Sequence, residues 1–123
     1  MVSRLKPEIV ARAEEFSDRM LDVVDALEKK RVYARIIDQM VGCGTSVGAN
    51  VCEADQAMSA NDFCKALGVS VKELGECGYW LRLCVRRKWI PASRLTKLQD
   101  EGVQLLKIFG TMIKRTRAKN RKR

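Results

Sequence analysis

The chain has 123 residues, of which 46% are hydrophobic, so it can form one folded domain with a core. It carries 24 Lys and Arg against 15 Asp and Glu, a formal net charge of +9, and it contains no histidine. The absence of histidine excludes Ser-His-Asp triads, Cys-His dyads and zinc sites with histidine ligands. The net charge favours a polyanionic partner.

The first two predicted elements are helices over residues 9–27 and 36–54. In both, apolar residues recur at alternating steps of three and four, as they do on one face of a helix. The polar sequence 28–31 separates them. All eight glycines of the chain fall within predicted helices, and Gly44 and Gly48 lie one turn apart in the second. Because an interior glycine costs a helix about 1 kcal/mol relative to alanine, we expect close backbone contacts between helices or between subunits.

The third and fourth elements are helices over residues 63–84 and 95–112. Ser59 is the expected N-cap of the third helix, because an acidic residue follows it three positions later. Pro91 or Ser93 begins the fourth. The connections are short, which favours antiparallel neighbours. The predicted fold is therefore all-α, an antiparallel up-down-up-down four-helix bundle formed by residues 1–113.

Five cysteines occur at positions 43, 52, 64, 77 and 84, so the chain has no Cys-x-x-Cys pair. This spacing excludes a zinc knuckle, and the odd number argues against a closed disulfide framework. No secretory signal and no run of 18 apolar residues is visible, so we expect no membrane partner. We predict reduced cysteines that act as small hydrophobic residues, and a cytoplasmic location.

The positive charge is concentrated in residues 114–123, which carry seven cations and no acid. Subtracting these seven from the total of +9 leaves +2 for the other 113 residues. We expect this segment to be a basic C-terminal tail, disordered beyond the fourth helix, that contacts RNA or DNA. The candidate contacts in the tail are Lys114, Arg115, Arg117, Lys119, Arg121, Lys122 and Arg123.

A second basic group is expected at the other end of the bundle. In an up-down-up-down arrangement the first and third helices end on the same side, whereas the tail leaves from the opposite end, near Arg4 and Lys6. The result is a nearly neutral body with two positive poles. The candidate contacts at this second end are Lys29, Lys30, Arg31, Arg82, Arg86, Arg87 and Lys88.

A cluster of polar residues lies on the second and third helices. Gln39, Ser46, Asn50 and Glu53 occur on one flank of the second helix, and Glu73 adjoins the apolar seam of the third. We interpret these five residues as a structural hydrogen-bond network that fixes helix register. The alternative is an active-site or metal-binding carboxylate pair, but di-metal bundles use Glu-x-x-His motifs, and this chain has no histidine. We therefore expect no catalytic residue, no metal and no cofactor.

The larger aromatic residues are Tyr33, Tyr79, Trp80 and Trp89. Aromatic rings can stack on nucleobases, but they make up only 6% of this chain. We therefore expect these four to make core or subunit contacts.

Four short segments form a recognisable pattern: Gln-Met at 39–40, Ser-Val-Gly-Ala-Asn-Val-Cys-Glu at 46–53, Asp-Phe at 62–63 and Glu-Leu at 73–74. In this pattern the sequence resembles the four-helix bundle protein family, also called the 23S ribosomal RNA intervening-sequence protein family, over about residues 8–115. One departure is Ala54, where family members usually have glycine. The strongly basic tail is not part of the family signature.

The resemblance implies a small cytosolic bundle that assembles into a ring, typically a homopentamer, without an established catalytic activity. It also implies a relationship to the accessory variability determinant proteins of diversity-generating retroelements, which are basic pentamers that partner a reverse transcriptase and bind nucleic acid. The expected function is therefore that of a non-enzymatic, oligomeric nucleic-acid-binding accessory protein. The alternative is a structural adaptor that docks a protein partner, such as a retroelement reverse transcriptase.

Overall fold

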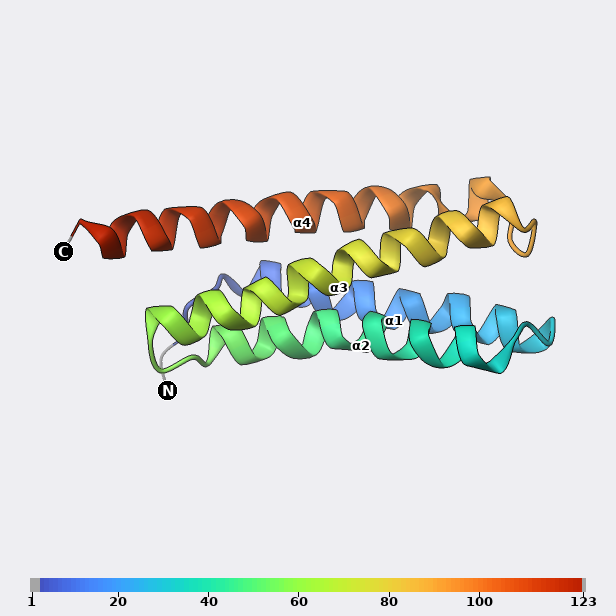
Figure 1. Ribbon diagram of the computed structural model, residues 1–123, viewed down its shortest axis with the longest axis horizontal. Coiled ribbons are helices and arrows are strands. Elements are labelled where there is room, and N and C mark those ends of the chain that lie inside the picture. The colour runs from blue at the N-terminus through green and yellow to red at the C-terminus, as the bar shows by residue number, and fades with distance from the viewer. Residues whose placement is uncertain (1–2, 123) are drawn as a thin grey trace.

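A computed structural model describes residues 3–122 and shows four helices in this part of the chain. Consecutive helices run antiparallel and are joined by short loops (Figure 1). The all-α prediction is confirmed, and the arrangement is that of a four-helix bundle. The helices are α1 (Pro7–Lys29), α2 (Ala34–Asp55), α3 (Ala60–Arg86) and α4 (Ala92–Arg121).

The two predicted helix starts are present. The Ser59 hydroxyl oxygen accepts a hydrogen bond of 3.1 Å from the Asp62 backbone N–H, which satisfies one of the free donors at the start of α3. Of the two candidates for the start of α4, Pro91 is the N-cap. Its backbone is extended, and the helix begins at the next residue.

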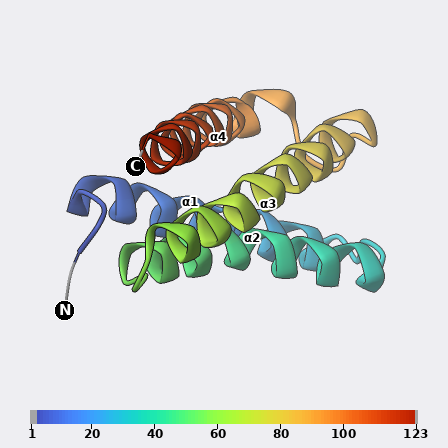
Figure 2. The same ribbon diagram turned by 60° about the vertical axis from the view of Figure 1, so that its left-hand side comes forward.

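The four helices do not pack equally. α2 packs closely against α1 and α3, and α4 packs along α3, but α4 meets α1 at few places (Figure 2). Because α3 packs against both α2 and α4, its apolar seam is buried from Phe63 to Cys84. On α4, by contrast, Leu98, Gly102 and Met112 are only half-buried. The side of the bundle between α1 and α4 is therefore its open side.

Two glycines allow α2 to lie close to α1. A Cβ atom at Gly44 would stand 2.8 Å from the Met20 Cβ, and one at Gly48 would stand 2.9 Å from the Ser17 hydroxyl oxygen. The same hydroxyl oxygen accepts a 2.9 Å hydrogen bond from the Gly48 backbone N–H. The expected close approach between helices is therefore confirmed for these two glycines.

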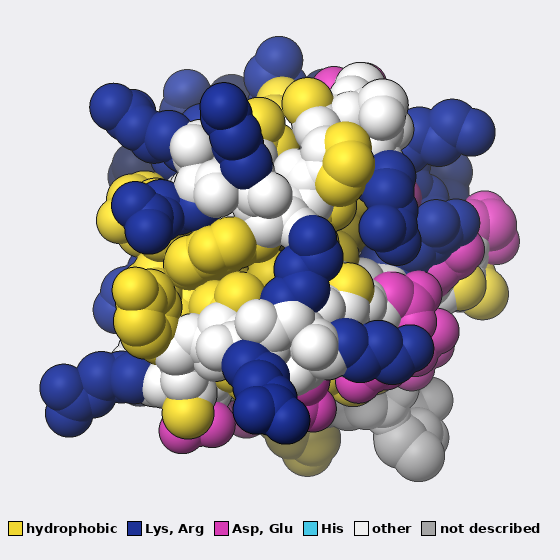
Figure 3. All heavy atoms as spheres, turned by 90° about the vertical axis from the view of Figure 1, so that its right-hand side faces the viewer, with side chains coloured by type: hydrophobic (Ala, Val, Ile, Leu, Met, Phe, Trp, Pro, Cys, Tyr) yellow, Lys and Arg dark blue, Asp and Glu magenta, His cyan; other side chains and the backbone are white. Residues whose placement is uncertain are grey.

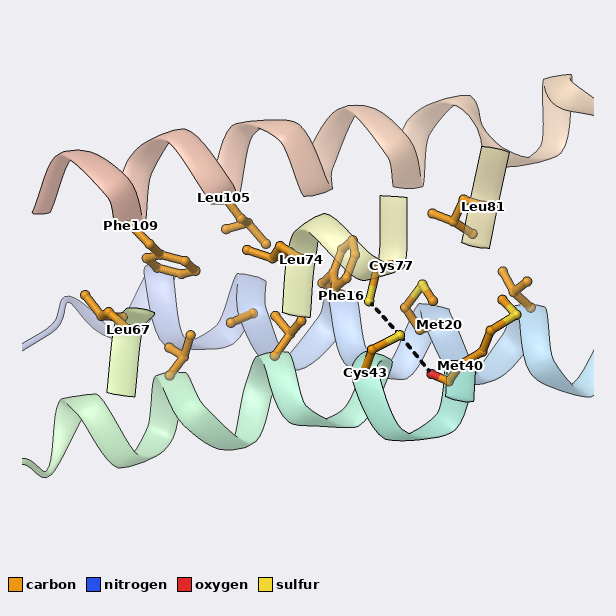
Figure 4. Packing of buried hydrophobic residues seen from close by; sticks show 14 of the residues in the cluster. Phe16, Met20, Met40, Cys43, Leu67, Leu74, Cys77, Leu81, Leu105 and Phe109 are labelled. Atoms are coloured by element: carbon orange, nitrogen blue, oxygen red, sulfur yellow. Dashed lines mark hydrogen bonds between the residues drawn. The ribbon is translucent and has the colours of Figure 1, made fainter. Parts of the chain in front are cut away.

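The core contains a pair of cysteine thiols (Figure 4). The Cys77 thiol donates to the Cys43 Sγ at 3.5 Å, and the Cys43 thiol donates to the Met40 carbonyl at 3.6 Å. The contact with Cys43, together with burial, raises the pKa of the Cys77 thiol, and burial raises the pKa of Cys84 to about 11. All five cysteines are free and four of them are buried, as expected for unreactive core residues.

The basic C-terminal segment is helical, so the predicted disorder is wrong. α4 continues beyond the core residue Ile113 to Arg121 and projects past the other helices (Figure 1). No glycine or proline interrupts residues 114–122, and Lys, Arg and Ala favour a helix. Cations also interact favourably with the C-terminal end of the helix dipole. A helix already formed by its core contacts therefore extends through the charged run.

Candidate nucleic-acid interface

The predicted basic residues lie at the two ends of the bundle. The α1–α2 and α3–α4 loops share one end, which we call the loop pole, and α4 projects from the other, which we call the tail pole (Figure 1). The loop pole comprises the predicted Lys29, Lys30, Arg31, Arg82, Arg86, Arg87 and Lys88, together with Arg35 and Arg94. The tail pole comprises Arg4, Lys6, Lys114, Arg115, Arg117, Lys119, Arg121 and Lys122, whereas the predicted Arg123 lies outside the described residues.

Sequence reasoning missed two members of the loop pole. Arg35 and Arg94 lie in the first turns of α2 and α4, and both of these helices begin at this end of the bundle. Their positions follow from the same topology that places the ends of α1 and α3 together. Cations in a first helical turn face an unfavourable helix dipole, so neither residue is there to stabilise its helix.

Figure 3 looks directly onto the loop pole. Lys and Arg side chains surround this face, and acidic side chains gather toward one side of it. Residues 29–35 carry four cations and no acid, and residues 86–94 carry four more and no acid. Within residues 3–122, none of these eight cations forms an ion pair. Their charges are therefore available to an external anion.

Both helices that end at the loop pole finish in the same backbone motif. At the end of α1, the Val32 N–H donates to the Leu27 carbonyl at 3.2 Å and the Arg31 N–H donates to the Glu28 carbonyl at 3.0 Å. This pair of bonds is a Schellman motif, in which one residue takes the left-handed conformation. That residue is Arg31, with φ of 56°.

The end of α3 repeats this motif. The Trp89 N–H donates to the Cys84 carbonyl at 2.9 Å, and the Lys88 N–H donates to the Val85 carbonyl at 3.0 Å. Lys88 takes the left-handed conformation, with φ of 59°. Each loop therefore presents a cation at the position that glycine most often occupies in this motif.

Two edge-to-face aromatic pairs lie on the surface. At the loop pole, the ring centroids of Tyr33 and Trp89 are 6.3 Å apart, and the Arg87 guanidinium carbon lies 5.9 Å from the Trp89 ring centroid. On α3, the centroids of Tyr79 and Trp80 are 4.9 Å apart. Trp80 packs against the core, as expected, whereas Tyr79 is half exposed.

At the tail pole, an aspartate fixes the start of the chain. The Asp55 Oδ1 accepts backbone hydrogen bonds from Leu5 at 2.7 Å and from Arg4 at 3.0 Å. The bond from Leu5 is the largest cause that lowers the pKa of Asp55 below its usual value. Arg4, Lys6 and Arg115 line one surface hollow of about 410 Å³, so the N-terminal segment adds its charges to those of α4.

The structure brings together only two of the five residues in the predicted polar network. The Asn50 Nδ2 donates to the Ser46 carbonyl at 2.9 Å and to the Ser46 hydroxyl at 2.8 Å, and both residues belong to α2. Gln39 and Glu53 are exposed and Glu73 is half-buried. Within residues 3–122, no side-chain hydrogen bond joins these three to the others.

Two serines that were not predicted for this network do link neighbouring helices. The buried Ser70 hydroxyl of α3 donates to the Val47 carbonyl of α2 at 3.1 Å, and Ser17 of α1 accepts from Gly48 as described above. Ser70 lies on the apolar seam of α3, and this position was the only signal for its role. These two contacts between helices therefore each join a short hydroxyl to a backbone group.

Within residues 3–122, no group of three or more Cys, Asp or Glu side chains is placed to hold a metal ion. None of the described helices combines the length and the apolar character that a membrane crossing requires.

The comparisons with known proteins agree with this architecture. A sequence profile of the 23S rRNA-intervening sequence protein family matches residues 6–111. The fold is similar to that of a protein of unknown function from the S23 ribosomal protein family of Bacteroides thetaiotaomicron, with a TM-score of 0.81 and 29% identity, over 86% of this chain and 98% of that chain. No curated protein shows a significant match. Because the profile covers most of the chain, the chain belongs to the 23S rRNA-intervening sequence protein family.

Proposed function

We propose that this protein is a non-enzymatic RNA- or DNA-binding accessory protein that acts through its loop pole and its tail pole. The observation that carries the proposal is that, within residues 3–122, the cations at both ends of the bundle have no ion-pair partner. Nucleic acid is the polyanion that such clusters bind with release of counterions. The family description refers to 23S rRNA, which supports RNA as the first nucleic acid to test.

The shape of the tail pole supports this proposal. The described basic run, residues 114–122, lies on a projecting helix, where a rise of 1.5 Å per residue gives a length of about 12 Å. Along one strand of a duplex, about four phosphates span this axial distance. A rigid basic helix orders its cations before binding, which reduces the entropy lost on contact.

Self-association as a homopentamer is part of the proposal. An apolar hollow of about 260 Å³ between α3 and α4 is lined in part by Gly75, Gly78 and Val103, and Val103 is 53% exposed. A second subunit packed here would remove this apolar surface from water. Five chains of +9 each would carry about +45, which strengthens attraction to nucleic acid.

The proposal includes a cytoplasmic location and no catalytic activity or cofactor. The five free cysteines support the location, because free thiols are typical of reducing compartments. The absence of histidine supports the lack of catalysis, because histidine is the commonest acid–base residue at neutral pH.

A structural adaptor that docks a reverse transcriptase is the second candidate function, and it rests on the resemblance to retroelement accessory proteins. The apolar hollow lined by Val103 favours it, because such a surface also fits a protein partner. In this case the basic segment of residues 114–123 would only steer the partner toward the protein or keep the protein soluble. Capture of a reverse transcriptase that survives nuclease but is lost in Val103→Glu would favour the adaptor.

Charge-neutral variants test the proposed function. One variant replaces the seven cations of residues 114–123 with glutamine, and another does the same for Lys29, Lys30 and Arg31. Each should bind a labelled 20-nucleotide RNA at least tenfold more weakly in a fluorescence anisotropy titration. Neutralising the exposed residues Lys72 and Lys107, which lie near the middle of α3 and α4, is the control and should change affinity little. Unaltered affinity in both pole variants would show that the poles do not bind RNA.

A further inference from the structure

An exposed aromatic ring lies within the loop pole. Tyr33 is 65% exposed, and it contacts Trp89, which belongs to the other loop. The two loops thus meet through their rings, with the Arg87 guanidinium beside Trp89. Single-stranded nucleic acids bind where an aromatic ring that can stack on a base is surrounded by cations that contact phosphates.

The two loops also keep cations at conformationally costly positions. Arg31 and Lys88 take φ values of 56° and 59°, which glycine adopts more easily than any residue with a Cβ. Arg31 lies two residues before Tyr33, and Lys88 directly precedes Trp89. Each loop therefore places a positive charge close in sequence to one ring of the Tyr33–Trp89 pair.

The second Tyr–Trp pair provides a contrast within the same molecule. The Trp80 indole N–H donates to the Glu76 carboxylate at 3.1 Å, so a negative charge adjoins the Tyr79–Trp80 pair. This carboxylate would repel a phosphate. At the loop pole, the neighbouring sequence segments carry cations and no acid. The Tyr33–Trp89 pair therefore has the Arg87 guanidinium beside it, whereas the Tyr79–Trp80 pair has the Glu76 carboxylate beside it.

We propose that the loop pole binds unpaired nucleotides of a single-stranded nucleic acid, with a base stacked on Tyr33 and phosphates held by Arg31, Arg87 and Lys88. This inference rests on the proposed function and deepens it. It predicts a preference for single strands, since bases in a duplex are already stacked and leave only the phosphates for contact. For Tyr33, this proposal replaces the expected core or subunit contact with base stacking.

Affinity for three labelled probes tests this site in the full chain. The probes are a 12-nucleotide oligouridine, the matching oligothymidine and a 12-base-pair RNA duplex. Tyr33→Ala should bind both single strands about tenfold more weakly, because one stacked base is lost, and should bind the duplex as the original chain does. Tyr33→Phe should retain the affinity, and Tyr79→Ala is the matched control that should change none of the three.

A glycine substitution separates binding from folding. Lys88→Gly removes a charge and also relieves the left-handed backbone, so it should weaken binding to all three probes while raising the melting temperature. A further readout uses the two tryptophans of the chain. In a Trp80→Phe background, oligouridine should quench the fluorescence of Trp89, and the added Tyr33→Ala substitution should reduce this quenching.

The outcomes distinguish this inference from the proposed function. If the original chain binds the probes with strong salt dependence and Tyr33→Ala binds oligouridine equally well, the stacking site is wrong and the proposed function stands. An equal loss on single strands and duplex in Tyr33→Ala would also overturn the stacking site, because stacking affects only unpaired bases. If the original chain binds none of the probes, both proposals fail.

Discussion

Arg12 of α1 holds Glu101 of α4 through two hydrogen bonds, from Nε to Oε2 at 2.9 Å and from Nη2 to Oε1 at 2.6 Å. The hydrogen bond from Arg12 lowers the pKa of Glu101 below its usual value. The pair lies on the open side of the bundle, where α1 and α4 meet at few places. On this side the bidentate ion pair links α1 to α4, whereas the other neighbouring helices are held together by apolar packing.

Glu101→Gln should lower the free energy of unfolding by about 0.5–1 kcal/mol, the range expected for an ion pair whose side chains are 33% and 30% exposed. Urea denaturation at low salt measures this change. Glu15→Gln is the matched control, because Glu15 pairs with Arg19 at 3.6 Å and both side chains are largely exposed. An equal effect in the two variants would contradict a special role for the bond between α1 and α4.

Stability should fall in acid because of Asp55. Its pKa is lowered in the folded chain, mainly by the backbone hydrogen bond from Leu5, so its contribution is complete above the unfolded carboxyl pKa of about 4. That contribution is lost as pH falls through the lower, folded pKa. Denaturation midpoints measured from pH 7 downward should show a smaller acid loss in Asp55→Asn. Asp100 is exposed, so Asp100→Asn is the control and should lose as much stability in acid as the unsubstituted chain does.

Substitution by alanine should have opposite effects on stability at two glycines of α2. Gly44→Ala should destabilise the fold by about 1–3 kcal/mol, because the new Cβ would stand 2.8 Å from the Met20 Cβ. Gly42→Ala should stabilise it by up to about 1 kcal/mol, because a Cβ there meets no atom within 4 Å. Thermal melts of the two variants check the prediction. A stabilised Gly44→Ala would mean that α1 and α2 are farther apart than described.

The cysteines should differ in reactivity. Cys52 is only partly buried, whereas the other four cysteines are buried. The pKa of the Cys52 thiol is raised, first by its partial burial and then by the 3.5 Å hydrogen bond that it donates to the Glu14 carboxylate. In the folded protein, a disulfide reagent should modify one thiol per chain, and the other four should react only after unfolding. Cys52→Ser should abolish the reaction of the folded protein. Rapid modification of Cys77 would contradict the buried thiol pair.

The fold could be predicted well from the sequence because its main determinants are local. The three-and-four spacing of apolar residues is strongest on α3, where every seam position from Phe63 to Cys84 is buried. On α2 the pattern was less decisive, since Val51 is fully buried and Asn50 beside it is not. With 3.6 residues per helical turn, two neighbouring positions can both lie near the apolar face of a helix. Which of the two is buried depends on how the helix packs against its neighbours.

The site was only partly predictable. The up-down topology and the charge run of residues 114–123 were enough to place cations at two ends. The tail helix was missed because a local charge rule ignores the helix that precedes the run. The meeting of Tyr33 with Trp89 was also missed, because these residues are distant in sequence and only the loop geometry brings their rings together. Ser17 and Ser70 were overlooked for the same reason: their partners are backbone groups.

The salt dependence of RNA affinity tests the central claim most directly. For the full chain and a single-stranded RNA, the logarithm of the association constant should fall linearly with the logarithm of salt concentration. Each phosphate that a cation neutralises adds about −0.7 to this slope, so at least four contacts give a slope of about −3 or steeper. Substituting glutamine for the cations of residues 114–123 should make the slope shallower. Binding that depends on phosphate contacts normally weakens between about 50 and 200 mM salt. An affinity that stays constant over this range would contradict nucleic-acid binding through the basic poles.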